Sequence, residues 1–175
     1  MSVDNAVMEC IETRRCVRSY RADVPPDDLV DAVVEAGTYA ATGRGLQSPI
    51  IVRITDRRVR DELARINASI LGSDTDPFYG APVVLAVLAD RNVSTHVEDG
   101  SLVIGNMMLA AHSIGLGSCW IHRCREQFET PEGRAILDGL GIGPEYVGVG
   151  NCIVGYVDGG YPEARPRKDG RVYRI

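Results

Sequence analysis

The chain of 175 residues has a mass of 19.0 kDa, which suits one domain of ordinary size and is short for two. Apolar residues make up 45% and charged residues 25%, a globular composition that excludes a disordered segment and a coiled coil. The net charge of −5 argues against a nucleic-acid-binding protein held by bulk charge. We therefore expect one domain over residues 1–175 that does not bind nucleic acid.

The sequence shows no membrane-spanning run, no secretory signal and no paired-cysteine motif, and this pattern suggests the cytoplasm. The longest apolar run, Ala81 to Ala89, is about half of the roughly 20 residues that a membrane-spanning helix needs. No basic head precedes an apolar stretch at the N-terminus, so no secretory signal is visible. We expect a cytoplasmic protein with no membrane association. Its cysteines form no C-x-x-C pair and are expected to be reduced thiols: Cys10, Cys16, Cys119, Cys124 and Cys152.

Two helices are predicted before the first strand. Asp4 is a good N-cap for a short helix that ends near Thr13. The segment 14–21 has four arginines in eight residues and no apolar stripe, so it is expected to be a turn or an extended segment. Pro25 and Pro26 open a helix that reaches about Tyr39. There follow a loop at 43–49, a strand at 50–54, a helix capped by Asp56 and a loop at 72–80.

The second half carries the clearest core elements. Pro82 to Leu88 is apolar on both faces, which predicts a central strand covered on both sides. The segment 94–113 is apolar around most of its circumference and is expected to be a long buried helix. There follow an extended segment at 119–121, a helix at 130–137, a last strand at 146–157 and a tail at 158–175 with no core element of its own.

The order of these elements predicts the fold class. Strand pairs are separated by more than one helix, and only three or four strands are evident. We therefore expect an α+β fold, with helices packed around a small mixed β-sheet, rather than a regular βαβ series.

Three familiar motifs fail on their spacing. Gly148 and Gly150 lack the third glycine of a dinucleotide-binding turn, and a strand follows where a helix should begin. Gly117 to Trp120 resembles a cysteine-protease nucleophile segment, but no histidine follows His122, whereas that chemistry needs one far downstream. Cys119 and Cys124 flank His122, but the other histidines are too scattered to complete a zinc site.

Basic residues at the two ends of the chain leave two interpretations open. Guanidinium groups match phosphate oxygens with two parallel hydrogen bonds, so arginines from both ends are able to hold one anion. The alternative is a set of solvated arginines and a frayed basic tail. The residues concerned are Arg14, Arg15 and Arg18 near the start, and Arg165, Arg167 and Lys168 near the end.

Two of these segments resemble a known family. Arg14 to Tyr20 reads R-R-C-V-R-S-Y, and Ala40 to Pro49 reads A-A-T-G-R-G-L-Q-S-P. They resemble the R-R-S-x-R and A-P-[ST]-x-x-N-x-Q-P-W motifs of the FMN-dependent nitroreductase family. Further similar segments, Gly80 to Val84, Asp99 to His112 and Gly115 to Ile121, follow in the same order, so the resemblance covers nearly the whole chain.

The resemblance implies a nitroreductase-like fold and a homodimer with FMN at the subunit interface, each C-terminal tail wrapping the partner subunit. It implies that arginines from both ends hold the phosphate, that Gln47 lies near the ribityl chain or the ring, and that N–H groups around Gly117 and Ser118 approach the ring. The cofactor-binding residues would be Arg14, Arg15, Cys16, Arg18, Gln47, Gly117, Ser118, Arg165 and Arg167.

The chain departs from the family motifs at several positions. Cys16 replaces a serine, Ala41 a proline, and Gly45 an asparagine, while Ser48 and Pro49 replace Pro-Trp. Without an asparagine amide at position 45, the loop has one polar group fewer for the cofactor.

The implied activity is carried by FMN, and no side chain is required as acid or nucleophile. NADH or NADPH would reduce the flavin at N5, leave, and be replaced by a nitroaromatic or quinone in a ping-pong reaction. A positive charge near N1 and O2, from Arg123 or an N–H group, would stabilise the reduced flavin. Two alternatives stay open: an enzyme that uses reduced FMN for dehalogenation or consumes the flavin, and a flavin- or phosphate-binding protein without turnover.

Overall fold

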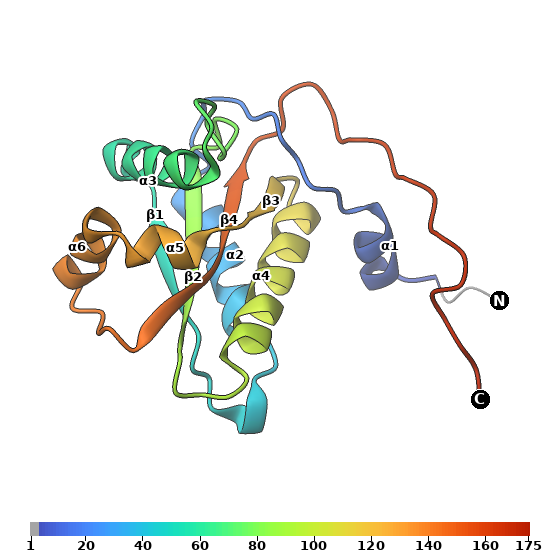
Figure 1. The fold of residues 1–175 in the computed structure, drawn as a ribbon. Coiled ribbons are helices and arrows are strands. Elements are labelled where there is room, and N and C mark those ends of the chain that lie inside the picture. The colour runs from blue at the N-terminus through green and yellow to red at the C-terminus, as the bar shows by residue number, and fades with distance from the viewer. Residues whose placement is uncertain (1–3) are drawn as a thin grey trace.

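The computed structural model describes residues 4–175, and in them a four-stranded sheet lies between two layers of helices (Figure 1). The strands are β1 (Ile50–Ile54), β2 (Val83–Asp90), β3 (Gly117–Ile121) and β4 (Tyr146–Gly155). The helices are α1 (Ala6–Thr13), α2 (Asp27–Thr38), α3 (Arg57–Leu71), α4 (His96–Ser113), α5 (Cys124–Glu129) and α6 (Pro131–Gly139), with a 3₁₀ turn, η1, at Gly43–Gly45. The expected α+β fold is confirmed.

The sheet has the strand order β1-β2-β4-β3, and each neighbouring pair is antiparallel. The expectation of a mixed sheet therefore needs correcting: among residues 4–175 the parallel pairing is confined to an isolated bridge between Cys16 and Ser118. The reason lies in the last strand. Helix α4 returns the chain so that β2 and β3 run in the same direction, but β4 is inserted between them and opposes both.

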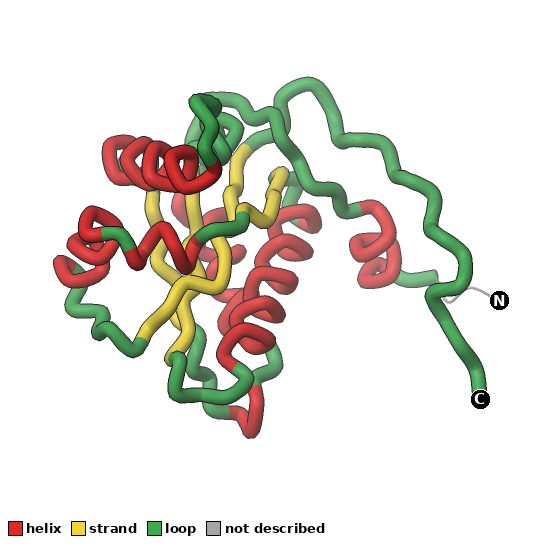
Figure 2. The backbone as a smooth tube through the Cα atoms, in the orientation of Figure 1, coloured by secondary structure: helices red, strands yellow, loops and turns green. Residues whose placement is uncertain are grey.

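Strand β2 is the centre of the core, as its sequence predicts. Alternate side chains belong to two separate apolar clusters, one shared with α3, α5 and α6 and the other with α2 and α4. These two groups of helices cover opposite faces of the sheet (Figure 2). Each fully buried Val or Leu side chain contributes roughly 1.5–3 kcal/mol to folding. The first cluster receives Val84, Ala86 and Leu88, and the second receives Val83, Leu85 and Val87.

Helix starts follow local capping chemistry. The N-cap of α1 is Asn5 and not Asp4, because the Asn5 side chain accepts the N–H groups of Val7 and Met8 at 3.0 Å. Asp56 caps α3 as predicted.

No described helix has both the length and the apolar character that a membrane crossing requires.

Helix α4 is buried on one face only, contrary to the expectation from its sequence. Met107 and Ala111 are fully buried against the sheet, whereas Leu102 on the other side is 51% exposed. On α1, Val7 and Ile11 are exposed as well. A cavity of about 380 Å³ lies between the apolar faces of these two helices. A single chain therefore leaves apolar surface of α1 and α4 uncovered.

The two ends of the chain meet beside the sheet. Tyr20 bridges Val157, and the N–H group of Asp158 donates to the carbonyl of Ser19 at 3.0 Å. Beyond that point residues 158–175 are exposed and form no helix or strand, and the tail extends away from the sheet toward the side on which α1 lies (Figure 1).

Candidate functional site

The basic segment that follows α1 is extended and lines the free edge of β3. The N–H group of Val17 donates to the carbonyl of Ser118 at 3.0 Å, next to the bridge between Cys16 and Ser118. Val17 and Tyr20 are buried, while Arg18 between them is exposed. Val17 and Tyr20 therefore anchor the segment, while Arg18 and Ser19 between them face outward.

Three of the four arginines of this segment, those at positions 14, 15 and 18, make different contacts. Arg15 donates from Nη1 to the carbonyls of Glu12 at 2.7 Å and Arg14 at 2.9 Å. It therefore supplies a hydrogen-bond donor to backbone carbonyl groups at the C-terminal end of α1. Arg14 lies with Nη1 3.7 Å from the sulfur of Cys16. The guanidinium of exposed Arg18 lies 6.0 Å from the ring centre of Tyr79. Arg14 and Arg18 are therefore the ones placed to receive an anion.

A cavity of about 160 Å³ lies beside Arg18, at the end of β3. One wall is the end of β3 and the turn that follows it, and the other is the loop between α3 and β2. Its lining comprises Arg18, Leu71, Thr75, Asp76, Pro77, Tyr79, Cys119, Trp120, Ile121, His122 and Arg123.

The turn after β3 is held from beneath by α3. Arg123 has a left-handed backbone conformation with φ of 69°, which is uncommon outside glycine. Its Nε donates to Oδ1 of fully buried Asn67 at 3.1 Å, and the Asn67 amide donates to the carbonyl of His122 at 3.0 Å. One asparagine therefore fixes both the backbone and the side chain of the turn that borders the cavity.

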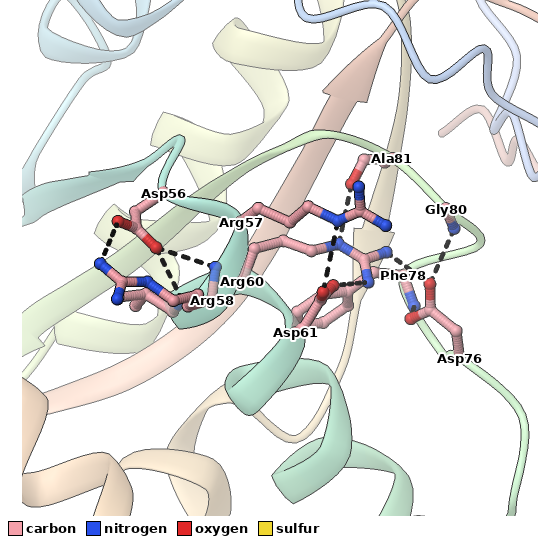
Figure 3. Close-up of polar contacts among 10 residues, drawn as sticks. Asp56, Arg57, Arg58, Arg60, Asp61, Asp76, Phe78, Gly80 and Ala81 are labelled. Carbon is pink, nitrogen blue, oxygen red and sulfur yellow. Dashed lines mark hydrogen bonds and ion pairs between the residues drawn. The ribbon is translucent and has the colours of Figure 1, made fainter.

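The loop on the opposite wall is anchored by Arg60, which is 8% exposed (Figure 3). Its Nε donates to the carbonyl of Ala81 at 3.0 Å, and its Nη2 pairs with Asp76. Asp76 in turn accepts the N–H groups of Phe78 and Gly80 at 2.8 Å each. This network fixes the loop that contains Tyr79, whose ring lies beside the guanidinium of Arg18.

Two cysteines belong to this part of the molecule. The Cys119 thiol donates to the carbonyl of Trp120 at 3.6 Å. The neighbouring Cys119 thiol, together with Arg14 and the charge of Arg18, lowers the pKa of Cys16 against the opposing effect of burial. The neighbouring Cys16 and burial raise the pKa of Cys119.

Among the other residues predicted for the site, Gly117 and Ser118 lie against the basic segment, whereas Gln47, Arg165 and Arg167 lie apart from Arg14 and Arg18 in this chain. Gln47 lines a different cavity, of about 330 Å³, between α2 and β1. Arg165 and Arg167 lie in the exposed tail, and within residues 4–175 neither has a hydrogen bond or ion pair to the basic segment. Ser118 is 2% exposed and Gly117 packs against Val17, so the chain itself covers the backbone there.

His112 links α4 to both chain ends. Its Nε2 lies 2.9 Å from the hydroxyl oxygen of Thr13, and its ring stacks edge-on against Tyr161 with a centroid distance of 5.2 Å. Burial, followed by the charges of Arg14 and Arg15, lowers the pKa of His112. Since the unfolded chain then binds this proton more readily, His112 destabilises the fold as the pH falls below about 6.5.

We therefore expect His112→Gln to lose less stability than the parent between pH 7 and pH 5. The check is the urea midpoint of each protein at both pH values, because only a difference between the two shifts isolates this histidine. Equal shifts in parent and variant would mean that His112 does not carry the pH dependence.

Comparison with known proteins identifies the family. The model of the nitroreductase family matches residues 11–156. An NADPH-flavin oxidoreductase of Vibrio harveyi is 30% identical over 79% of this chain, and an FMN reductase (NADPH) of Bacillus subtilis is 25% identical over 79%. The chain spans 65% and 66% of the lengths of these two relatives.

Among solved structures, a nitroreductase of Bacteroides fragilis with bound FMN superposes with a TM-score of 0.90 and is 29% identical. That match covers 98% of this chain and 100% of the other, so the two chains are of similar length. The basic segment, the sheet and the cavity at the end of β3 all lie within the matched region. This chain belongs to the nitroreductase family.

Proposed function

We propose that this protein is an FMN-dependent oxidoreductase that transfers hydride from NADH or NADPH to an electron-poor acceptor. The observation that carries the proposal is Arg18, exposed beside the cavity at the end of β3, together with half-buried Arg14 next to Cys16 in the same basic segment. The Bacteroides fragilis nitroreductase structure, which matches 98% of this chain, has bound FMN, and this supports the same cofactor here.

The residues present fit a flavin mononucleotide, provided that a second subunit completes the site. Two guanidinium groups suit a phosphate dianion. The cavity of about 160 Å³ is smaller than the roughly 300–1,000 Å³ typical of small-molecule sites, so one chain supplies only part of the wall. Surface from another subunit would supply the rest.

A homodimer accounts for the surface and the tail that one chain leaves exposed. The apolar faces of α1 and α4 would be covered by a partner. The tail, which has no core of its own, would pack on the partner and bring Arg165 and Arg167 toward the phosphate. A partner would also present Gln47 to the face that carries Arg14 and Arg18, which explains why one chain does not bring these residues together.

The chain's own groups would bind and orient the reactants. FMN, when bound, supplies hydride exchange at N5. Arg14 and Arg18 would hold the phosphate, and the turn fixed by Asn67 would present its N–H groups and the remaining guanidinium nitrogens of Arg123 at the cavity. Because these donors are fixed before binding, they would favour a negatively charged reduced ring without reorganisation.

A single cleft that serves donor and acceptor in turn predicts ping-pong kinetics. We expect initial rates measured with NADPH or NADH and a quinone or nitroaromatic to give parallel double-reciprocal lines. Intersecting lines would contradict the shared cleft while leaving the flavin chemistry intact. If a nicotinamide reduces the flavin but neither a quinone nor a nitroaromatic reoxidises it, an enzyme with another acceptor is favoured. If no nicotinamide reduces the flavin, a binding protein without turnover is favoured.

A further inference from the structure

The loop between α2 and β1 is tied to α4 by one buried carboxylate. Asp99, in the first turn of α4, is 3% exposed, and its Oδ1 accepts the N–H group of Gly43 at 2.9 Å. Its Oδ2 accepts the hydroxyl of Thr95 at 3.0 Å. Negative charge is favoured near a helix N-terminus, which together with these two donors explains why a carboxylate is stable there. The bond to Gly43 crosses 56 positions of the sequence and therefore serves the loop and not the helix.

Position 43 has space for glycine only. A Cβ atom at Gly43 would lie 2.3 Å from the hydroxyl oxygen of Thr95 and 3.2 Å from the Thr95 Cβ atom. The Gly43 backbone is not left-handed, so the constraint is one of space and not of conformation. The loop backbone therefore packs directly against the residue that precedes α4.

The segment 42–47 of this loop has a conformation that few side chains adopt. Arg44 and Gln47 have left-handed backbones, with φ of 54° and 51°. The hydroxyl oxygen of Thr42 accepts the N–H group of Gln47 at 3.1 Å, and the Gln47 side chain is exposed and lines the cavity between α2 and β1. Such backbones persist where surrounding contacts hold them, and they are frequent at binding sites. The bond from Gly43 to Asp99 is a contact of that kind.

This loop and the basic segment lie at opposite ends of α4 (Figure 1). The loop bonds to Asp99 in the first turn of the helix, whereas the basic segment bridges Ser118, which follows the last turn. The 18 residues of α4 span about 27 Å. One chain therefore does not bring Gln47 and Arg14 to the same mononucleotide, and a loop from a second subunit is needed to complete the site.

We propose that Asp99 is a positioning residue that fixes the segment 42–47, and through it Gln47, for the FMN that the basic segment of the partner subunit holds. The inference rests on the proposed function, because it requires FMN at that site. Asp99 does not touch the cofactor and acts through the N–H group of Gly43. The alternative is that Asp99 stabilises only the start of α4, and variants separate these two roles.

The first test compares the FMN affinity of full-length apoproteins by fluorescence titration. Asp99→Ala removes both hydrogen bonds and is expected to weaken FMN binding about tenfold, the lower end of the effect of a hydrogen bond to a charged group. Asp99→Asn keeps an oxygen for the Gly43 N–H group and should recover most of that loss. Thr95→Val removes only the bond within α4 and should weaken binding less than Asp99→Ala. Parental affinity in Asp99→Ala, or equal losses in Asp99→Ala and Thr95→Val, would overturn the proposal.

A second variant moves the loop while the carboxylate stays in place, and it serves even if Asp99→Ala does not fold. In Gly43→Ala the added methyl group collides with the Thr95 hydroxyl, so the loop shifts away from α4 and FMN binding should weaken. The double variant Gly43→Ala/Thr95→Ala removes the nearest obstacle and should recover part of the affinity. Parental affinity in Gly43→Ala would mean that the position of the loop has no effect on the cofactor.

Mixed dimers show on which subunit's flavin the loop acts. A dimer of one Arg14→Ala subunit and one Asp99→Ala subunit would contain one site with both changes and one site with neither. We expect FMN titration of this dimer, purified through two different affinity tags, to give half of the sites parental affinity. If no site has parental affinity, Asp99 acts within its own subunit or only on stability, and the proposal is wrong.

The same titrations distinguish this inference from the proposed function. A parent protein that binds FMN, with Asp99→Ala binding it equally well, keeps the flavin-dependent function and removes the positioning role. A parent protein that takes up no FMN contradicts both.

Discussion

Replacing Arg60 with methionine is expected to lower the free energy of unfolding by about 3 kcal/mol, the lower end of the cost of breaking a buried ion pair. Arg60 is 8% exposed and bonds to the Ala81 carbonyl, Asp61 and Asp76. Methionine fills much of the same space but leaves the Asp76 carboxylate and the Ala81 carbonyl without this donor. We place the value at the lower end because the Asp76 side chain is 35% exposed and regains some water.

The neighbouring Arg57 provides a matched control on the same helix. Its side chain is 93% exposed and pairs with Asp61 at 3.6 Å, so Arg57→Met should change the free energy of unfolding by less than about 0.5 kcal/mol. Urea unfolding followed by circular dichroism checks both variants, provided that the slope is unchanged. Equal midpoints for the two variants would show that the Arg60 network does not stabilise the loop.

Arg14→Ala is expected to weaken FMN binding by about 1.5–3 kcal/mol, or roughly 10- to 150-fold, the scale of a hydrogen bond to a charged group. Arg14 is half-buried in the basic segment, with Nη1 3.7 Å from the Cys16 sulfur, and alanine provides no donor for the phosphate. Fluorescence titration of the apoprotein with FMN measures the change. Unchanged affinity would move the phosphate to another part of the molecule.

Arg15 and Arg58 test whether this effect depends on position and not merely on charge. Arg15 donates to two carbonyls at the end of α1, so Arg15→Ala should affect FMN binding less than Arg14→Ala. The Arg58 side chain is 94% exposed on α3, and Arg58→Ala should leave FMN affinity unchanged. Equal losses in all three variants would indicate a general charge effect and contradict a specific phosphate contact.

The parts of the fold that depend on local sequence were predictable. The doubly buried strand β2 and the starts of α3 and α6 follow from apolar runs and capping residues. Helix α5 was missed, because six residues are too few for an apolar stripe and its place depends on the burial of Cys124, Gln127 and Phe128 by distant elements. The insertion of β4 between β2 and β3 is likewise a long-range choice that no local pattern encodes.

The candidate site divides in the same way. The basic segment was recognised from its composition, but the separate role of Arg15 depends on where α1 ends. Arg60 and Asn67 were missed although a signal existed. They fall on the same stripe of α3 as the buried Leu63 and Ile66, and polar residues within an apolar stripe indicate buried hydrogen bonds. Their partners lie in distant loops, so the sequence shows the unusual positions without the contacts.

The most direct test of the proposed function is an anaerobic titration of the FMN-loaded protein with NADH and, separately, with NADPH. The proposal predicts stoichiometric bleaching of the visible flavin absorbance by at least one nicotinamide and full recovery when a quinone is added. A protein that cannot take up FMN, or bound FMN that neither nicotinamide bleaches, would contradict it.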